Sequence, residues 1–160
     1  MANTTFTGPV RSENGFSTIV KDTTTGAITN TMTFSEYTAT VTVANGQTTG
    51  KESAIGIPAN FIPMGVTIAV TGAATNAVNL VDIGTDADPD GFVDGITAAV
   101  NSLGFKGFFP CNGVLGMSGG ATTASTATPD EVEVVLGGDP GADTTIVMKF
   151  IGIASSSDAS

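Results

Sequence analysis

The stretch from residue 27 to residue 44 constrains the fold more than any other part of the chain. Its apolar side chains fall on alternate positions, and Thr occupies most of the positions between them. Successive side chains of a β-strand point to opposite faces, so this period of two is typical of a half-buried antiparallel strand. The apolar residues of the pattern are Ile28, Met32, Phe34, Tyr37, Ala39, Val41 and Val43.

The rest of the chain also favours strands and turns. Asn45-Gly46 follows the first pattern directly and predicts a hairpin, with a return strand through residues 52–57, because both positions of a type I′ turn need positive φ. Pro58 and Pro63 cannot donate to a ladder, so the segment around them is a predicted bend. Further strands are predicted at residues 17–20, 64–71, 77–83, 131–136 and 144–153.

These patterns predict an all-β fold in a single domain of 160 residues. About eight short antiparallel strands would form a β-sandwich or jelly roll. The predicted organisation is an extended N-terminal arm at 1–24, the sandwich at 25–153 and a flexible tail at 154–160. A low-complexity loop is predicted at residues 119–128.

One segment has a different period. Beyond Asp90 the apolar residues recur at intervals of three and four, which predicts one short helical turn. Asp88 or Asp90 would cap its start, where the helix dipole favours an acid. The apolar residues of this pattern are Phe92, Ile96, Ala99, Val100 and Leu103.

Charge and residue usage argue against several classes of function. The five Lys and Arg residues are scattered among 15 Asp and Glu, for a net charge of −10, so we expect neither nucleic acid nor a membrane as a partner. The chain has no His and therefore no Ser-His-Asp or Cys-His pair, and we predict that it is not an enzyme. The N-terminus lacks the pattern of a signal peptide. The single Cys111 is expected to be a partly buried residue at a turn.

Four closely spaced aspartates raise the question of a metal site. Asp86, Asp88, Asp90 and Asp94 match the opening of a calcium loop, in which alternate oxygens converge on the cation. Thr97 stands where an EF-hand needs a bidentate Glu, and the preceding residues are a predicted strand rather than a helix. We therefore predict a polar structural corner without a cofactor, and a calcium site of another kind remains the alternative.

Several segments resemble small structural proteins of tailed bacteriophages. The residues that carry the resemblance are GVTIAVT at 65–71 and NLVDIGTDADPDGF at 79–92, with IPAN at 57–60 and IVMKFI at 146–151 on either side. The opening FTGPVRSENGF at 6–16 is similar to that of head-decoration proteins of marine podophages. The resemblance covers about two thirds of the chain, which departs from the pattern at Asn60, where Gly is typical, and in the Ala-rich loop around Ala121.

The resemblance implies a capsid decoration (cement) protein, located on the capsid exterior of the virion after synthesis in the host cytoplasm. Its implied partners are the major capsid protein and sister copies in a homotrimer. The N-terminal arm is then the candidate surface for capsid or subunit binding. A phage head-fibre or tail component and a calcium-dependent β-sandwich binding module are the alternative functions. The candidate binding residues of the arm are Phe6, Pro9, Val10, Arg11 and Phe16.

Overall fold

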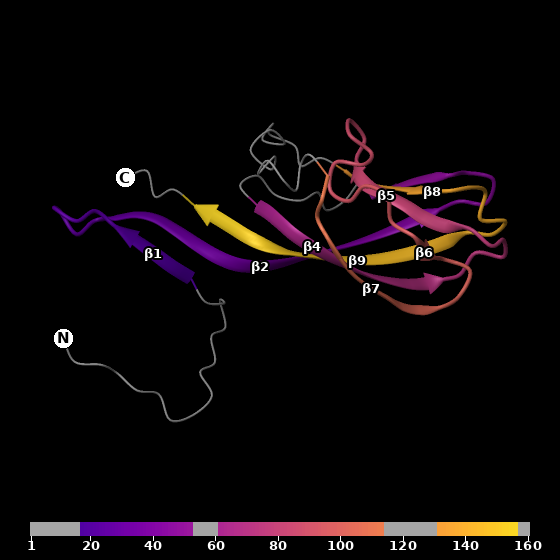
Figure 1. Ribbon diagram of the computed structural model, residues 1–160, viewed down its shortest axis with the longest axis horizontal. Helices are drawn as coiled ribbons and strands as arrows, with labels where there is room; N and C mark the ends of the chain where they lie inside the picture. Colours follow the sequence, from indigo (N-terminus) through magenta and orange to yellow (C-terminus); the bar gives the residue numbers. More distant parts are fainter. Residues whose placement is uncertain (1–16, 53–60, 114–130, 157–160) are drawn as a thin grey trace, which may run out of the picture.

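The computed structural model describes residues 17–52, 61–113 and 131–156. In these residues two antiparallel sheets pack face to face, which confirms the predicted all-β sandwich (Figure 1). The described part contains no helix, and hence none that could cross a membrane. The loop predicted at 119–128 lies outside it.

The larger sheet has five strands in the order β1-β2-β9-β4-β7. Its central strand, β9, pairs along nearly its whole length with β2 on one side and β4 on the other. The sheet is therefore completed by the last strand of the chain. Its strands are β1 (Ser17–Lys21), β2 (Ile28–Val43), β4 (Phe61–Gly72), β7 (Gly104–Pro110) and β9 (Thr144–Ser156).

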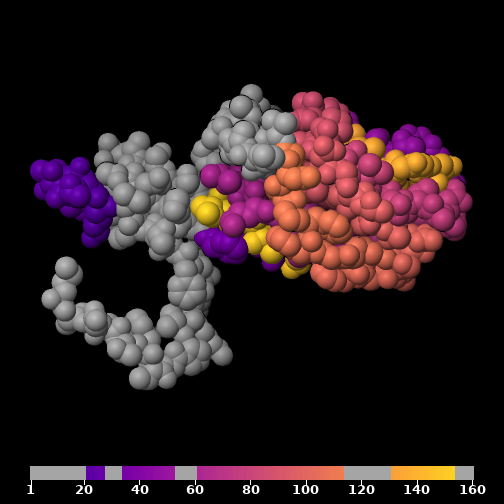
Figure 2. Space-filling model, in the orientation of Figure 1, coloured from indigo at the N-terminus to yellow at the C-terminus, as the bar shows by residue number. Residues whose placement is uncertain are grey.

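The smaller sheet has four strands in the order β3-β8-β5-β6. It covers only part of the larger sheet. In Figure 1, β1, the first part of β2 and the end of β9 extend beyond it on the left, and in Figure 2 the turn that begins at Asp22 lies at the extreme left. The strands of the smaller sheet are β3 (Thr49–Glu52), β5 (Asn79–Thr85), β6 (Ala98–Ala99) and β8 (Val132–Leu136).

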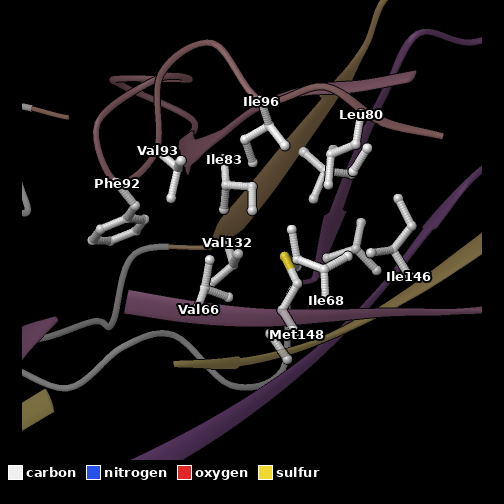
Figure 3. Close-up of a cluster of buried hydrophobic side chains, with 14 of the residues drawn as sticks. Val66, Ile68, Leu80, Ile83, Phe92, Val93, Ile96, Val132, Ile146 and Met148 are labelled. Carbon is white, nitrogen blue, oxygen red and sulfur yellow. The ribbon is translucent and has the colours of Figure 1, made fainter. Parts of the chain in front are cut away.

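The core fills the space between the two sheets (Figure 3). Alternate residues of β4 and β9 are fully buried and face the apolar residues of β5 and β8. Two edge-to-face aromatic pairs extend this core, Tyr37 with Phe61 at a centroid distance of 4.7 Å and Phe92 with Phe150 at 5.4 Å. The labelled core residues from these four strands are Val66, Ile68, Leu80, Ile83, Val132, Ile146 and Met148.

The ends of the sandwich differ in detail from the predicted boundaries. Strand β1 lies within the predicted arm and pairs with β2, while residues 1–16 are outside the described part. The turn after β1 is built on Asp22, whose carboxylate accepts hydrogen bonds from the N–H groups of Thr24 and Thr25. These bonds, that of Thr25 first, lower the pKa of Asp22. At the other end, β9 continues to Ser156, past the predicted start of the tail at residue 154.

The hairpin predicted after β2 does not form in the described residues, and residues 53–57 of its predicted return strand lie outside them. The turn at Asn45-Gly46 forms, and Gly46 has a φ of 80°. The chain then crosses to the other sheet, where β3 pairs with β8 instead of β2. The β8–β9 loop holds the turn in place, because Asp143 accepts the N–H of Asn45 and Asp139 accepts that of Gly46. A turn signal in the sequence specifies the local backbone and not the partner of the next strand.

The helical turn predicted after Asp90 is also wrong. The segment runs antiparallel to β5. Val93 forms a β-bridge with Ile83, and further along the segment the short strand β6 pairs with β5. Ile96, Ala98 and Val100 are buried and alternate with exposed residues, as in a strand. Pairing with the open edge of β5 provides partners for the backbone N–H and C=O groups of this segment. This pairing overrides the spacing of the apolar residues, which fits a helix equally well.

Substitutions of a buried and an exposed leucine test the packing of this core. We expect Leu80→Ala to lower the free energy of unfolding by about 3 kcal/mol, because Leu80 is fully buried between the sheets and its loss leaves a cavity. Leu103 is 66% exposed, and Leu103→Ala should change the stability by less than about 0.5 kcal/mol. Urea unfolding followed by circular dichroism measures both values. Equal effects of the two substitutions would contradict the described packing.

Candidate functional site

The four aspartates lie at one end of the sandwich, in a segment that we call the aspartate corner, residues 82–94. Thr85 and Asp88 exchange backbone hydrogen bonds of 2.8 and 3.1 Å, and the N–H of Gly91 donates to the carbonyl of Asp88 at 3.0 Å. The Thr85 hydroxyl also accepts the Asp88 N–H at 3.2 Å. These bonds reverse the chain within a few residues, so the Pro-Asp-Gly sequence acts as a tight turn.

The corner returns the chain onto the open edge of β5. The N–H groups of Phe92 and Val93 both donate to the carbonyl of Ile83, and Ile83 donates back to Val93. Further along, Ile96 donates to Val81 at 2.6 Å. The returning side chains of Phe92, Val93 and Ile96 are buried in the core. The corner therefore closes one end of the sandwich.

Two glycines let the backbone approach closely at this point. A Cβ atom on Gly84 would overlap the carbonyl of Asp88 and the backbone of Pro89. A Cβ atom on Gly113 would overlap the backbone of Asp90 and Gly91. The corner thus folds down onto β5, and its position depends on the absence of side chains at both glycines.

Lys51 of β3 links the aspartate corner to the smaller sheet through ion pairs. Its ammonium group bonds to the carboxylate of Asp86 and lies 3.7 Å from Oε2 of Glu133. Glu133 is opposite Lys51 in the β3–β8 ladder, and it is only 6% exposed. The hydrogen bond to Asp86 is the main cause that raises the pKa of Lys51. It outweighs the opposing effect of desolvation, and the charges of Asp86 and Glu133 raise this pKa by smaller amounts. Lys51 therefore stays charged, and its single positive charge offsets part of the negative charge of Asp86 and Glu133.

The other acidic side chains of the corner have separate roles. Asp88 and Asp90 share a hydrogen bond, which raises the pKa of Asp88. Asp82 accepts the N–H of Gly95 at 3.0 Å. The backbone of Asp94 exchanges two hydrogen bonds with the side chain of Asn112. Within residues 17–52, 61–113 and 131–156, no three acidic or thiol side chains are grouped so that they could hold a metal ion.

Cys111 lies beside this corner, directly before Asn112. Its side chain is partly buried, as the sequence predicts, and it packs against the core. Burial raises the pKa of the Cys111 thiol to about 12, so the thiol is protonated at neutral pH. Its backbone N–H donates to the carbonyl of Met64 at 3.1 Å and links the end of β7 to β4.

The chain matches no protein-family model, and no curated protein matches it in sequence. The candidate binding residues of the N-terminal arm, Phe6, Pro9, Val10, Arg11 and Phe16, lie outside the described residues.

Sequence reasoning missed the two side chains that hold the corner from outside it. Lys51 is distant from the aspartates in sequence, and only the pairing of β3 with β8 brings the two together. Asn112 follows β7 and reaches Asp94 from there. A signal for Lys51 was present, because it is one of only five basic residues in the sequence.

A substitution at Gly84 tests whether the corner depends on close backbone contact. We expect Gly84→Ala to destabilise the chain by about 2 kcal/mol, because the new methyl group meets backbone atoms that cannot move aside. Gly138→Ala is the matched control, since its Cβ would lie 3.4 Å from a Val78 methyl group, an ordinary contact. Urea unfolding of both variants gives the two values, and an unaffected Gly84→Ala protein would show that the corner is held elsewhere.

Calcium provides a separate test of the aspartate corner. We expect the melting temperature to be the same in calcium and in EDTA, because Asp86 is paired with Lys51 and the described carboxylates are not grouped in threes around one point. Differential scanning calorimetry measures it. A large rise with calcium that Asp88→Ala abolishes would contradict this expectation and favour the calcium-dependent binding module.

Proposed function

We propose that the chain is a structural virion protein that binds the outer surface of a tailed-phage capsid and stabilises the shell. The resemblance of residues 79–92 to phage decoration proteins carries this proposal. Residues 65–71 and 146–151 share in the resemblance and belong to β4 and β9, which are neighbours in the larger sheet. Residues 79–85 form β5 of the smaller sheet, and the similar segments 6–16 and 57–60 lie outside the described residues.

The architecture of the corner supports the proposal of a structural protein. The carboxylates of the corner hold turns and a neighbouring lysine, which are structural tasks. A decoration protein acts by contact over a surface, and many copies on a regular shell give high avidity to weak individual contacts. A two-sheet sandwich provides broad surfaces for such contacts.

The proposed partners follow from the same resemblance. They are the major capsid protein and sister copies of the chain in a homotrimer, and the capsid exterior is the proposed location. The arm residues Phe6, Pro9, Val10, Arg11 and Phe16 would serve as a tether to the capsid or to a neighbouring copy. A head-fibre or tail component built on the same β unit is the alternative function.

Binding to emptied capsids tests the proposal. We expect the purified chain to cosediment with capsids that lack it and to raise the temperature at which they break. Deletion of residues 1–16 should weaken binding by about tenfold or more if the arm is the tether, which corresponds to about 1.4 kcal/mol. Cosedimentation at several protein concentrations measures the affinity.

The controls separate the two parts of this proposal. Full-length chain that neither sediments with capsids nor stabilises them would refute the decoration function. Unchanged affinity of the chain that lacks residues 1–16 would refute only the tether. Leu103→Ala, which leaves the core intact, serves as the binding-competent reference.

A further inference from the structure

The five-stranded sheet has a second face, turned away from the smaller sheet, which we call the outer face. On β2 and β9 it consists of the residues between the buried ones, such as Thr40 beside Val147. The ladders continue it across β4 and β7, where Thr67 lies beside Phe108 and Ala69 beside Phe105. In the described residues no element covers this face. The other surface of the same strands forms the core.

Large apolar side chains are concentrated on this sheet. Six such side chains are exposed in the described residues, and five of them belong to β2, β4 and β7. Ile153 of β9 lies between Phe34 and Ile62 in the ladders and joins them into one row. Apolar surface is more stable when it is removed from water, and a large exposed patch is typical of an interaction surface. The five are Phe34 (60% exposed), Ile62 (39%), Met64 (53%), Phe105 (69%) and Phe108 (54%).

On β2 and β9 the outer face is electrically neutral, in a strongly acidic chain. The ionisable side chains at its described positions on these two strands are Glu36 and Lys149, which form an ion pair of 2.9 Å with each other. The aspartate corner and the β8–β9 loop, with Asp139 and Asp143, are elsewhere in the sandwich. Two copies with a net charge of −10 each would repel through most of their surfaces. They would not repel where their outer faces meet.

The Glu36–Lys149 pair also makes the face complementary to itself. Each copy presents one acid and one base side by side, so Glu36 of one copy can lie opposite Lys149 of the next and the reverse. Each of these side chains is 51% exposed and able to exchange partners. A partner with a strong charge of one sign would gain nothing from this arrangement.

The size of the outer face suits a stable contact. Four strands at a spacing of about 4.8 Å and a length of about 30 Å give on the order of 600 Å² before the relief of the side chains is counted. A standard interface takes about 800 Å² from each partner. The free edge of β7 is less suitable than the outer face as a contact with another molecule. A bulge at Lys106 and the terminal Pro110 interrupt the row of backbone N–H and C=O groups with which a further strand would pair.

We propose that the outer face of the five-stranded sheet binds a second copy of this chain. Phe34, Phe105 and Phe108 would be buried in the contact, and the Glu36–Lys149 pairs would set the register between copies. Two copies meet in this way face to face across a two-fold axis, because reciprocal pairing uses the same patch on both copies. The inference rests on the proposed function only in that copies of the chain associate, and it depends neither on a three-fold contact nor on capsid binding.

A substitution that introduces one charge on the outer face is the first test of the proposed self-association. The mass of the unaltered chain in solution, measured by sedimentation equilibrium, should be that of two copies or a multiple of two. Phe105→Asp should weaken association by at least about tenfold, because it brings like charges together at a contact that must be apolar. Ala99→Asp adds the same charge at an exposed site on β6 of the smaller sheet and should leave the mass unchanged.

Each result of this test has a definite meaning. A single-copy mass of the unaltered chain overturns the inference and leaves residues 1–16 or another protein as the occupant of the face. A multiple-copy mass that Phe105→Asp does not change also overturns it. Capsid binding is measured separately by cosedimentation, so failure of the self-association and failure of the decoration function are distinguishable.

A charge exchange avoids large changes in the apolar surface. Lys149→Glu places two acids side by side on each face and should shift the chain toward single copies. Glu36→Lys together with Lys149→Glu restores opposite charges and should restore the multiple-copy mass. Circular dichroism verifies that each variant is folded. No effect of Lys149→Glu on the mass would contradict the proposed register.

Discussion

The pairing of β9 between β2 and β4 is the interaction on which the rest of the fold depends. It contributes Ile146, Met148 and Phe150 to the core, and each of these side chains is fully buried. Without β9, β2 and β4 would share no ladder, and the smaller sheet would have no continuous surface to pack on. Since β9 is the last strand of the chain, these contacts join residues that are far apart in sequence. Folds dominated by such contacts form slowly compared with those built from local ones.

The sequence predicted the class of fold and much of its core, because alternation over a long strand allows few interpretations. It predicted Val41 and Val43 on the buried face of β2, and both are buried. The alternation changes phase between Phe34 and Tyr37, which places Phe34 on the outer face at 60% exposure. The pairing of strands could not be derived in the same way, because an Asn-Gly turn and an apolar run carry no information on which edge is free. The errors at β3 and after Asp90 both have this origin.

The aspartate corner was predicted as structural, and its hydrogen bonds give that prediction a physical basis. Local spacing identified the tight turn at Asp88 and Gly91, since Pro-Asp-Gly favours one backbone conformation. The contacts with Lys51 and Asn112 come from other strands and could not be found from the motif. The outer face was missed for a related reason. Its apolar residues are spread over four strands, and they meet only when the order of the sheet is known.

The buried thiol of Cys111 has a consequence for any assembly that the chain forms. Disulfide exchange requires a thiolate, and a thiol with a pKa of about 12 provides almost none at neutral pH. This is the only cysteine in the sequence. If copies of the chain pack closely, as we propose, this thiol would not join them covalently. Their association would then depend on non-covalent contacts alone and would stay reversible.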